Sequence, residues 1–269
     1  MAAPLDKASR TVSPLKFFIL TYILSWAIWI VLILASSQIS EGLSTIVRLF
    51  GVLMPAGSAI ILTAHYTGSK GIRQLFSRLK IWRVGAKWWL VAIFAYPLLL
   101  IIAGLLYNLF DSQSVVNLLS LDVGILIANI IFLLLASLGE EVGWRGVALP
   151  ALQKRYSPFV SSLILGLLWS AWHLPFWVLI GTLSQYGWVY FVMNFLFIVP
   201  TTFLITWVFN NTKGSLLLPV VFHVVFNVVN VAIFPVTGSV GAFGIFIALQ
   251  FVIMIAIMPA LRKTKPFNV

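Results

Sequence analysis

Residues 123–149 read VGILIANIIFLLLASLGEEVGWRGVAL. The run is longer than the roughly 20 apolar residues that a membrane-crossing helix needs. It also carries two adjacent carboxylates, Glu140 and Glu141, followed by Arg145. An ionisable side chain at the centre of a spanning helix costs about 2.5–3.5 kcal/mol on insertion scales, so such residues face the protein interior and usually mark function. The stretch therefore predicts both a transmembrane helix and a site within it.

The composition of the whole chain agrees with a membrane protein. Hydrophobic residues make up 61% and charged residues 9% of the 269 residues, and the mean hydropathy is +1.08. A soluble domain is typically about half apolar and a quarter charged. We expect an all-α, polytopic helical bundle that forms a single integral membrane domain over residues 1–269. The eight predicted spans are 16–36, 45–66, 88–107, 123–149, 158–180, 187–209, 215–234 and 240–261.

The basic residues give the expected orientation. Eight spans place 15 of the 17 Lys and Arg residues on the side of the termini, the exceptions being Arg48 and Arg145. Because positive charge collects in cytoplasmic loops, both termini are predicted to be cytoplasmic. Membrane topology also explains the net charge of +11, so the bilayer, and no nucleic acid, is the partner that this charge implies. The predicted location is the plasma membrane.

Residues 67–87 alternate basic and apolar residues at helical spacing. They predict an amphipathic helix on the cytoplasmic leaflet. Its lipid-facing residues would be Ile72, Leu75, Phe76, Leu79 and Trp82, and its headgroup-facing residues would be Arg73, Arg78, Lys80 and Arg83.

The acidic pair predicts two different roles. On a helix Glu141 and Arg145 are four residues apart and share a face, so they can form an ion pair. Glu140 points about 100° away from Glu141. An ion pair that joins two helices would explain Glu141 and Arg145 structurally. A second buried carboxylate without its own partner favours a functional role for Glu140.

Two further stretches place polar residues in predicted spans. In LLWSAWHLPFW, residues 167–177, His173 shares a helix face with Trp169, and Pro175 predicts a kink. In LPVVFHVVFNVVN, residues 218–230, a polar stripe is formed by His223, Asn227 and Asn230. A histidine hydrogen-bonded within the bundle and asparagines that join helices are the structural alternatives.

These residues permit two hydrolytic mechanisms. In the first, Glu140, His173 and His223 bind a divalent metal such as zinc, which activates water. In the second, no cofactor is needed: Glu140 is the general base for water, while His223 and Asn227 stabilise the oxyanion. The chain has no cysteine and no HExxH motif, so both mechanisms depend on the carboxylate and the two histidines.

Three motifs resemble those of the CPBP family, the CAAX prenyl protease and bacteriocin-processing (Abi) intramembrane proteases. The family pattern is EExxxR, then an aromatic residue and xxxHis, then HisxxxAsn or Asp, within residues 138–230 here. Trp169 stands where the family often has Phe. The matching residues are Glu140, Glu141, Arg145, Trp169, His173, His223 and Asn227.

The resemblance implies an intramembrane endopeptidase whose cavity faces the cytoplasm. Glu140 would activate water, Arg145 would hold Glu141, and His173 would position the water or a metal. His223 and Asn227 would form the oxyanion site. The implied substrate is a membrane-associated protein or peptide, of CAAX type or leader type.

Two other functions remain as alternatives. A transporter could use buried Glu and His to carry protons, but transporters often repeat their broken helices in both halves. Here the polar motifs all fall in the second half of the chain. A noncatalytic bacteriocin-immunity protein is the other alternative, although all the motif residues are present.

Overall fold

The structure, a computed structural model, describes residues 12–110, 123–229, 239–264 and 267. Every regular element in these ranges is helical, which confirms the predicted all-α class. The α-helices are α1 Pro14–Leu34, α2 Glu41–Ser77, α3 Ala86–Phe110, α4 Val123–Gly143, α5 Leu149–Gln153, α6 Pro158–Trp172, α7 Leu174–Leu179, α8 Thr182–Asn211, α9 Leu217–Val228 and α10 Val240–Lys263. Short 3-10 helices span Ser36–Gln38 and Arg78–Lys80, and a π-helix spans Trp144–Ala148.

The helices form a polytopic membrane bundle. Among the described residues, six helices are long and apolar enough to cross a membrane, and Leu217–Val228 is a shorter apolar helix. The six are Pro14–Leu34, Glu41–Lys80, Ala86–Phe110, Pro158–Leu179, Gly187–Asn211 and Val240–Lys263. They match six of the eight predicted spans. The predicted span 123–149 is α4 followed by the π-helix, and the span 215–234 is α9 together with residues outside the described ranges.

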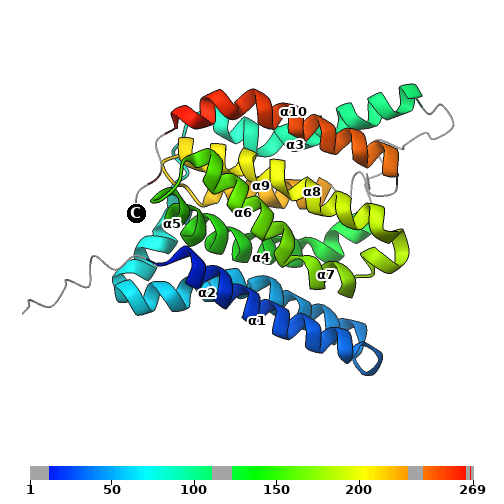
Figure 1. The fold of residues 1–269 in the computed structure, drawn as a ribbon, viewed down its shortest axis with the longest axis horizontal. Coiled ribbons are helices and arrows are strands. Elements are labelled where there is room, and N and C mark those ends of the chain that lie inside the picture. The colour runs from blue at the N-terminus through cyan, green and yellow to red at the C-terminus, as the bar shows by residue number, and fades with distance from the viewer. Residues whose placement is uncertain (1–11, 111–122, 230–238, 265–266, 268–269) are drawn as a thin grey trace, which may run out of the picture.

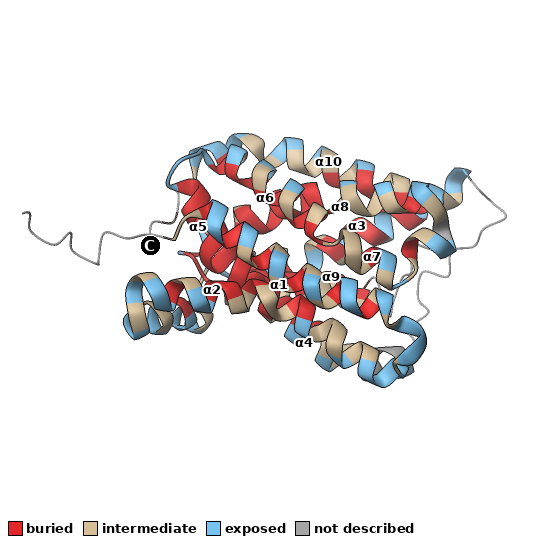
Figure 2. Ribbon diagram, turned by 60° about the horizontal axis from the view of Figure 1, so that its bottom comes forward, coloured by how far each residue is buried: buried red, intermediate tan, exposed pale blue. Residues whose placement is uncertain are grey.

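The bundle buries its ionisable motif residues and exposes many large apolar side chains. Buried residues gather along the inner faces of the helices and around α4 and α5 (Figure 2). Glu140, Glu141 and Arg145 are at most 4% exposed. The exposed side chains include many large apolar ones, such as Ile19, Ile23, Leu34, Leu90, Leu98, Leu105, Ile127 and Val252. This arrangement is expected where lipid surrounds the protein and ionisable groups face inward.

Two glycines bring α4 close to α2. A Cβ atom on Gly139 would lie 2.7 Å from the Cδ2 atom of Leu53, and one on Gly143 would lie 2.6 Å from the backbone carbonyl carbon of Pro55. Gly139 and Gly143 form a GxxxG face, which lets membrane helices approach closely. Because this face is turned to α2, helical geometry directs Glu141 to the opposite side of α4 and Glu140 to its flank.

Helix α2 continues into the predicted amphipathic segment 67–87. It kinks at Gly68, which has a φ of 66°, and ends at Ser77. The basic side chains of Arg73, Lys80 and Arg83 are exposed. Two side chains of this segment, Arg78 and Leu75, are oriented differently from the prediction.

The prediction that Arg78 faces headgroups and Leu75 faces lipid is wrong. Arg78 is 4% exposed and Leu75 is 5% exposed. The Arg78 Nη2 atom donates to the carbonyl oxygens of Arg145 at 3.1 Å and Gly146 at 3.0 Å. A π-helix alters the backbone hydrogen-bond ladder, and a buried carbonyl needs a donor. The π-helix therefore draws Arg78 inward, while Leu75 fills the space beside Gly146.

The ends of the helices show how the bundle is organised. α1 begins and α10 ends at the same end of the bundle, where α5 also lies (Figure 1). The basic residues of the predicted amphipathic segment follow α2 to this end, and Lys154 and Arg155 lie between α5 and α6. We call this the basic end. The opposite end is where α1 ends and α2 begins.

Candidate active site

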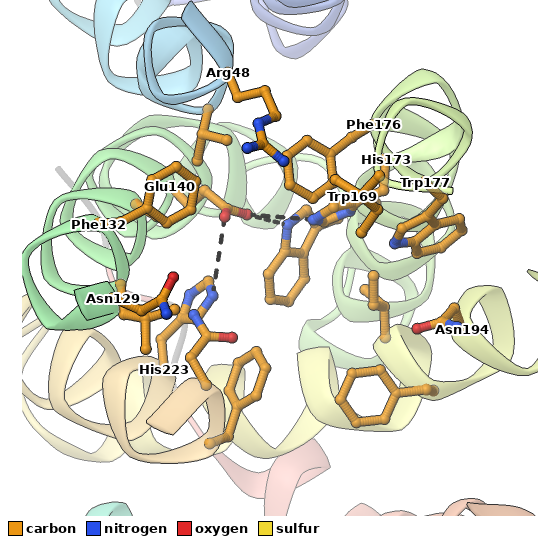
Figure 3. Close-up of a pocket in the computed structure, with 18 of the residues that line it drawn as sticks. Arg48, Asn129, Phe132, Glu140, Trp169, His173, Phe176, Trp177, Asn194 and His223 are labelled. Atoms are coloured by element: carbon orange, nitrogen blue, oxygen red, sulfur yellow. Dashed lines mark hydrogen bonds and ion pairs between the residues drawn. The ribbon is translucent and has the colours of Figure 1, made fainter. Parts of the chain in front are cut away.

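Glu140 lies at the centre of a group of side chains from three parts of the chain (Figure 3). It comes from α4, His173 from the junction of α6 and α7, and His223 from α9. The His173 Nε2 atom is 3.9 Å from Glu140 Oε2, and the His223 Nε2 atom is 4.0 Å from Glu140 Oε1. The structure thus brings together the three residues that sequence placed on separate spans.

Two indole groups hold the Glu140 carboxylate. Trp169 Nε1 donates to Glu140 Oε2 at 2.6 Å, and Trp144 Nε1 lies 3.4 Å from the same oxygen. A hydrogen bond to an ionised acceptor is stronger than one between neutral groups. Trp169 therefore does more than supply an aromatic ring: its indole N–H binds the carboxylate, which the Phe of the family pattern cannot do.

Glu141 lies behind Glu140, and one of its carboxylate oxygens contacts both Arg145 and His223. Its Oε1 atom accepts from Arg145 Nη1 at 2.9 Å and faces His223 Nδ1 at 2.8 Å. The predicted ion pair between Glu141 and Arg145 is confirmed, and both side chains are 0% exposed. The Arg145 guanidinium also lies over the ring of Trp169, with 4.5 Å to the ring centroid. Glu141 and Arg145 thus hold two other members of the site in place.

Both histidines are oriented through their Nδ1 atoms. His173 Nδ1 lies 2.8 Å from the carbonyl oxygen of Trp169, which can only accept a hydrogen bond. His223 Nδ1 faces the Glu141 carboxylate in the same way. Since the partner of one ring nitrogen fixes the tautomer, Nε2 of each ring remains available toward Glu140. The rings of Trp177 and Phe226 stack on His173 and His223, at centroid distances of 5.4 and 4.6 Å.

The predicted kink near Pro175 is confirmed. α6 ends at Trp172 and α7 begins at Leu174, so His173 sits between two helices. A proline cannot donate the backbone hydrogen bond that would continue the helix. The break carries the histidine to the level of Glu140.

Asn227 lies one turn after His223 on α9 and lines the same cavity. Its Nδ2 atom donates to Ser137 Oγ at 3.3 Å, and Ser137 in turn donates to the carbonyl oxygen of Leu133 at 2.7 Å. One amide hydrogen of Asn227 is thereby used and the other is left for a ligand. Asn230, the third member of the predicted stripe, lies outside the described residues.

A cavity of about 600 Å³ contains the site. Glu140, His173, His223 and Asn227 line it, together with aromatic and aliphatic side chains. The cavity extends to Glu41 and Arg48 near the start of α2, and to Ile180 at the end of α7. It therefore reaches toward the end of the bundle opposite the basic end.

The direction in which the cavity extends brings two of the sequence-based expectations into conflict. The positive charges predict that the basic end is cytoplasmic, whereas the resemblance implies a cavity that faces the cytoplasm. Because the cavity extends away from the basic end, the two expectations are incompatible for this chain. The sequence could not reveal the conflict, since it does not show on which side of Glu140 the helices separate.

The side chains around Glu140 have the donor chemistry of the expected metal site but a wider spacing. Two imidazole Nε2 atoms and a carboxylate have the right chemistry for zinc. Ligand atoms about 2.1 Å from a tetrahedral zinc lie roughly 3.4 Å apart, whereas the separations here are 3.9 and 4.0 Å. Glu140 Oε2 also accepts the Trp169 hydrogen bond. Within the described ranges, no group of three or more His, Cys, Asp or Glu residues is arranged to hold a metal ion.

Sequence reasoning missed three contributors to the site. Trp144 lies between the motif residues Glu141 and Arg145, and the signal that could have found it is its spacing of four residues from Glu140, which places both on one helix face. Ser137 reads as an ordinary small residue of a spanning helix until Asn227 is placed beside it. Arg48 enters the sequence analysis only as an exception to the distribution of basic residues, yet it lines the cavity.

Comparisons with known proteins agree with the motifs. Residues 122–229 match a protein family described as "Rce1-like: Type II CAAX prenyl endopeptidase Rce1-like". The matched segment contains Glu140, Glu141, Arg145, His173, His223 and Asn227. The chain is also similar to "CAAX prenyl protease 2" of Methanococcus maripaludis, with 27% identity over 232 residues, which is 82% of this chain and 84% of the relative.

Proposed function

We propose that the chain, whose residues 122–229 match the Rce1-like CAAX prenyl endopeptidase family, is a protease of that family and hydrolyses a peptide bond with a water activated by Glu140. The substrate is a membrane-associated protein or peptide. The observation that carries the proposal is the convergence of the Glu140 carboxylate and two imidazole Nε2 atoms at the same cavity. These are the atoms that we propose carry out the hydrolysis in this chain.

A single water fits the separations between these atoms. Two atoms that share one water lie roughly 4–5 Å apart, given hydrogen bonds of about 2.7–2.8 Å. The distances from Glu140 to His173 and His223 are 3.9 and 4.0 Å. Glu140 takes a proton from this water while the oxygen of the water attacks the peptide carbonyl carbon. As the carbon–nitrogen bond breaks, Glu140 gives the proton to the leaving amine.

The remaining residues orient the reaction. His173 holds the water through its Nε2 atom, because its Nδ1 atom is engaged by the Trp169 carbonyl. Asn227 donates a hydrogen bond to the oxyanion of the tetrahedral intermediate, and His223, one turn earlier on α9, donates another from Nε2 in its imidazolium form, whose Nδ1–H is held by Glu141. Glu141 sets the orientation of His223 and is itself held by Arg145. Glu141 and Arg145 are positioning residues in this mechanism.

We propose that this reaction needs no resident metal. The support is that the donor atoms lie 3.9 and 4.0 Å apart, farther than the roughly 3.4 Å between ligands of a tetrahedral zinc, and that Glu140 Oε2 already accepts the Trp169 hydrogen bond. The zinc alternative is tested by measuring peptide cleavage after exhaustive chelation. We expect the rate to be retained, and a loss that added zinc restores would support the metal mechanism.

The proposed topology is that of eight membrane crossings with the basic end in the cytoplasm. The two crossings beyond the six long apolar helices would be α4 with its continuation and α9 with the residues that follow it. The distribution of Lys and Arg supports this orientation. The cavity then extends toward the outer face of the membrane, for which the plasma membrane is the proposed location.

The proposed substrate is cleaved close to its C-terminus. This is what the resemblance of the three motifs to the CAAX protease family implies, and the name of the relative, "CAAX prenyl protease 2", is in line with it. The transport and immunity alternatives find no support in the comparisons, which match an endopeptidase family.

A comparison of membrane proteomes tests the function. Membranes that contain the wild-type protein are compared with membranes that contain Glu140→Ala at equal abundance. New peptide termini that depend on Glu140 would support proteolysis and identify the substrate. Identical termini in the two samples, with both proteins folded, would contradict it.

A further inference from the structure

Arg48 places a positive charge in the catalytic cavity. The side chain comes from α2 and lines the cavity together with Glu140 (Figure 3). Its Nη2 atom donates to Thr45 Oγ1 at 2.6 Å. Its Nε atom is buried, with no hydrogen-bond partner in the described part of the chain. None of the ion pairs between described residues includes Arg48.

The acidic residues near the cavity do not neutralise Arg48. Glu41 lies two turns earlier on α2 and is exposed, while Glu140 is engaged by Trp169. Neither carboxylate lies within ion-pair distance of Arg48 among the described contacts. A cation within a membrane protein is costly and is usually paired or marks a ligand pathway. Arg48 therefore has the chemistry of a site for an anionic group.

The backbone of Arg48 is fixed by the neighbouring helix. Trp29 Nε1 on α1 donates to the Arg48 carbonyl oxygen at 3.3 Å. Trp29 itself is 0% exposed. With its backbone anchored and its side chain beside the cavity, Arg48 is held where a ligand in the cavity can reach it.

The register between α2 and α4 places Arg48 a short distance from the proposed reaction. A Cβ atom on Gly139 would lie 3.6 Å from the Val52 carbonyl oxygen, so Val52 is level with the residue before Glu140. Arg48 is one helical turn earlier, or about 6 Å along the axis, in the direction of the cavity's outer end. An extended peptide advances about 3.3 Å per residue. A group one to three residues beyond the scissile bond would therefore reach Arg48.

The walls around this path are apolar. Phe132, Phe176, Trp177 and Ile180 line the cavity. Such walls suit the apolar side chains of a bound peptide and strengthen the attraction between unlike charges by excluding water. The expected occupant is a short apolar peptide segment that ends in a negative charge.

We infer that Arg48 binds the free C-terminal carboxylate of the substrate and so selects cleavage of a short C-terminal fragment. The inference rests on the proposed function, because it places the C-terminal carboxylate of the substrate relative to the peptide bond that Glu140 cleaves. A guanidinium binds a carboxylate through two parallel hydrogen bonds, which also fixes the peptide's direction. Arg48 would thus be a specificity residue that contacts the substrate.

The test compares two versions of one membrane-anchored peptide, whose sequence comes from the substrate identified in the membrane proteomes. One version has a free C-terminal acid and the other a C-terminal amide. We expect the wild-type protein to cleave the acid with a kcat/KM about 10- to 100-fold higher, mainly through KM, as expected for a charge-assisted hydrogen bond. In Arg48→Gln this ratio should fall to about 1, and Arg48→Lys should retain part of it. The control Arg73→Gln, an exposed arginine on the same helix, should keep the wild-type ratio.

The ratio of two substrates does not depend on how much of a variant is correctly folded. Equal cleavage of acid and amide by the wild-type protein would overturn the role of Arg48 and leave the proposed protease function standing. An unchanged ratio in Arg48→Gln would overturn it as well. Failure of the wild-type protein to cleave either peptide would instead contradict the proposed function.

Discussion

At the scale of single residues, the indole N–H of Trp169 distinguishes this site from one built with Phe. It donates to Glu140 at 2.6 Å, while its ring supports the Arg145 guanidinium. The sequence identified Trp169 as an aromatic replacement only. The hydrogen bond could not be inferred, because it depends on how α6 and α4 are rotated toward each other.

Replacement of Trp169 by Phe should slow proteolysis. Phe keeps an aromatic ring beside Arg145 but removes the donor that orients the Glu140 carboxylate. A hydrogen bond to a charged group contributes about 1.5–3 kcal/mol, so we expect kcat to fall about tenfold or more in an assay with purified protein. Trp188→Phe, at a 68% exposed position, is the matched control. A kcat within twofold of wild type for Trp169→Phe would show that this hydrogen bond does not matter for catalysis.

At the scale of helices, the stretch GEEVG joins packing to chemistry. Gly139 and Gly143 allow α4 to approach α2, and the two glutamates between them point toward other neighbours. α4 also packs against α9, which carries His223. The glycine face thus determines which carboxylate enters the cavity and which lies behind it.

Substitution of Gly143 by Ala should disturb this contact. The added Cβ atom would lie 2.5 to 2.7 Å from the Cβ, C and O atoms of Pro55, mostly backbone that cannot rotate away. Overpacking typically costs about 1–3 kcal/mol. We expect a lower melting temperature in detergent and reduced proteolysis.

Gly57→Ala on α2 provides the control for Gly143→Ala. Its added Cβ atom would meet only Met54, at an ordinary 3.7 Å. We expect wild-type stability there. A melting temperature for Gly143→Ala equal to that of the control would contradict the close packing of α2 and α4.

The site shows which features of a membrane protein the sequence can predict. Hydropathy locates the long spans, since their length and composition are local properties. The cost of buried charge identifies Glu140, Glu141, Arg145 and the histidines, and helical spacing predicts the pair of Glu141 with Arg145. The π-helix, the inward turn of Arg78 and the bond from Asn227 to Ser137 depend on contacts between distant segments. Hydrophobic periodicity carries no signal for them.

At the scale of the whole molecule, the charges and the cavity lie at opposite ends. The exposed basic residues that follow α2, and those between α5 and α6, lie at the basic end. The cavity extends toward Glu41, near the end of α1. If the positive charges set the orientation, the substrate reaches Glu140 from the outer side of the membrane.

Single cysteines can measure this orientation without background labelling, because the chain has no cysteine. Ser37 and Ser77 are exposed and lie at opposite ends of the bundle. We expect a membrane-impermeant maleimide to label Ser37→Cys in intact cells and Ser77→Cys only after permeabilisation. Labelling in the reverse order would place the cavity toward the cytoplasm.

The central claim is that Glu140 activates the water that cleaves the peptide bond. It is tested most directly by the cleavage rate of the Glu140→Gln variant, measured with purified protein in proteoliposomes and compared with wild type. Gln has nearly the same shape and can still accept the Trp169 hydrogen bond, but it cannot take a proton from water. General-base catalysis contributes about 10²–10⁴ to a rate, so we predict a loss of at least about a hundredfold in a protein that melts like wild type. Full proteolysis by Glu140→Gln would contradict the account.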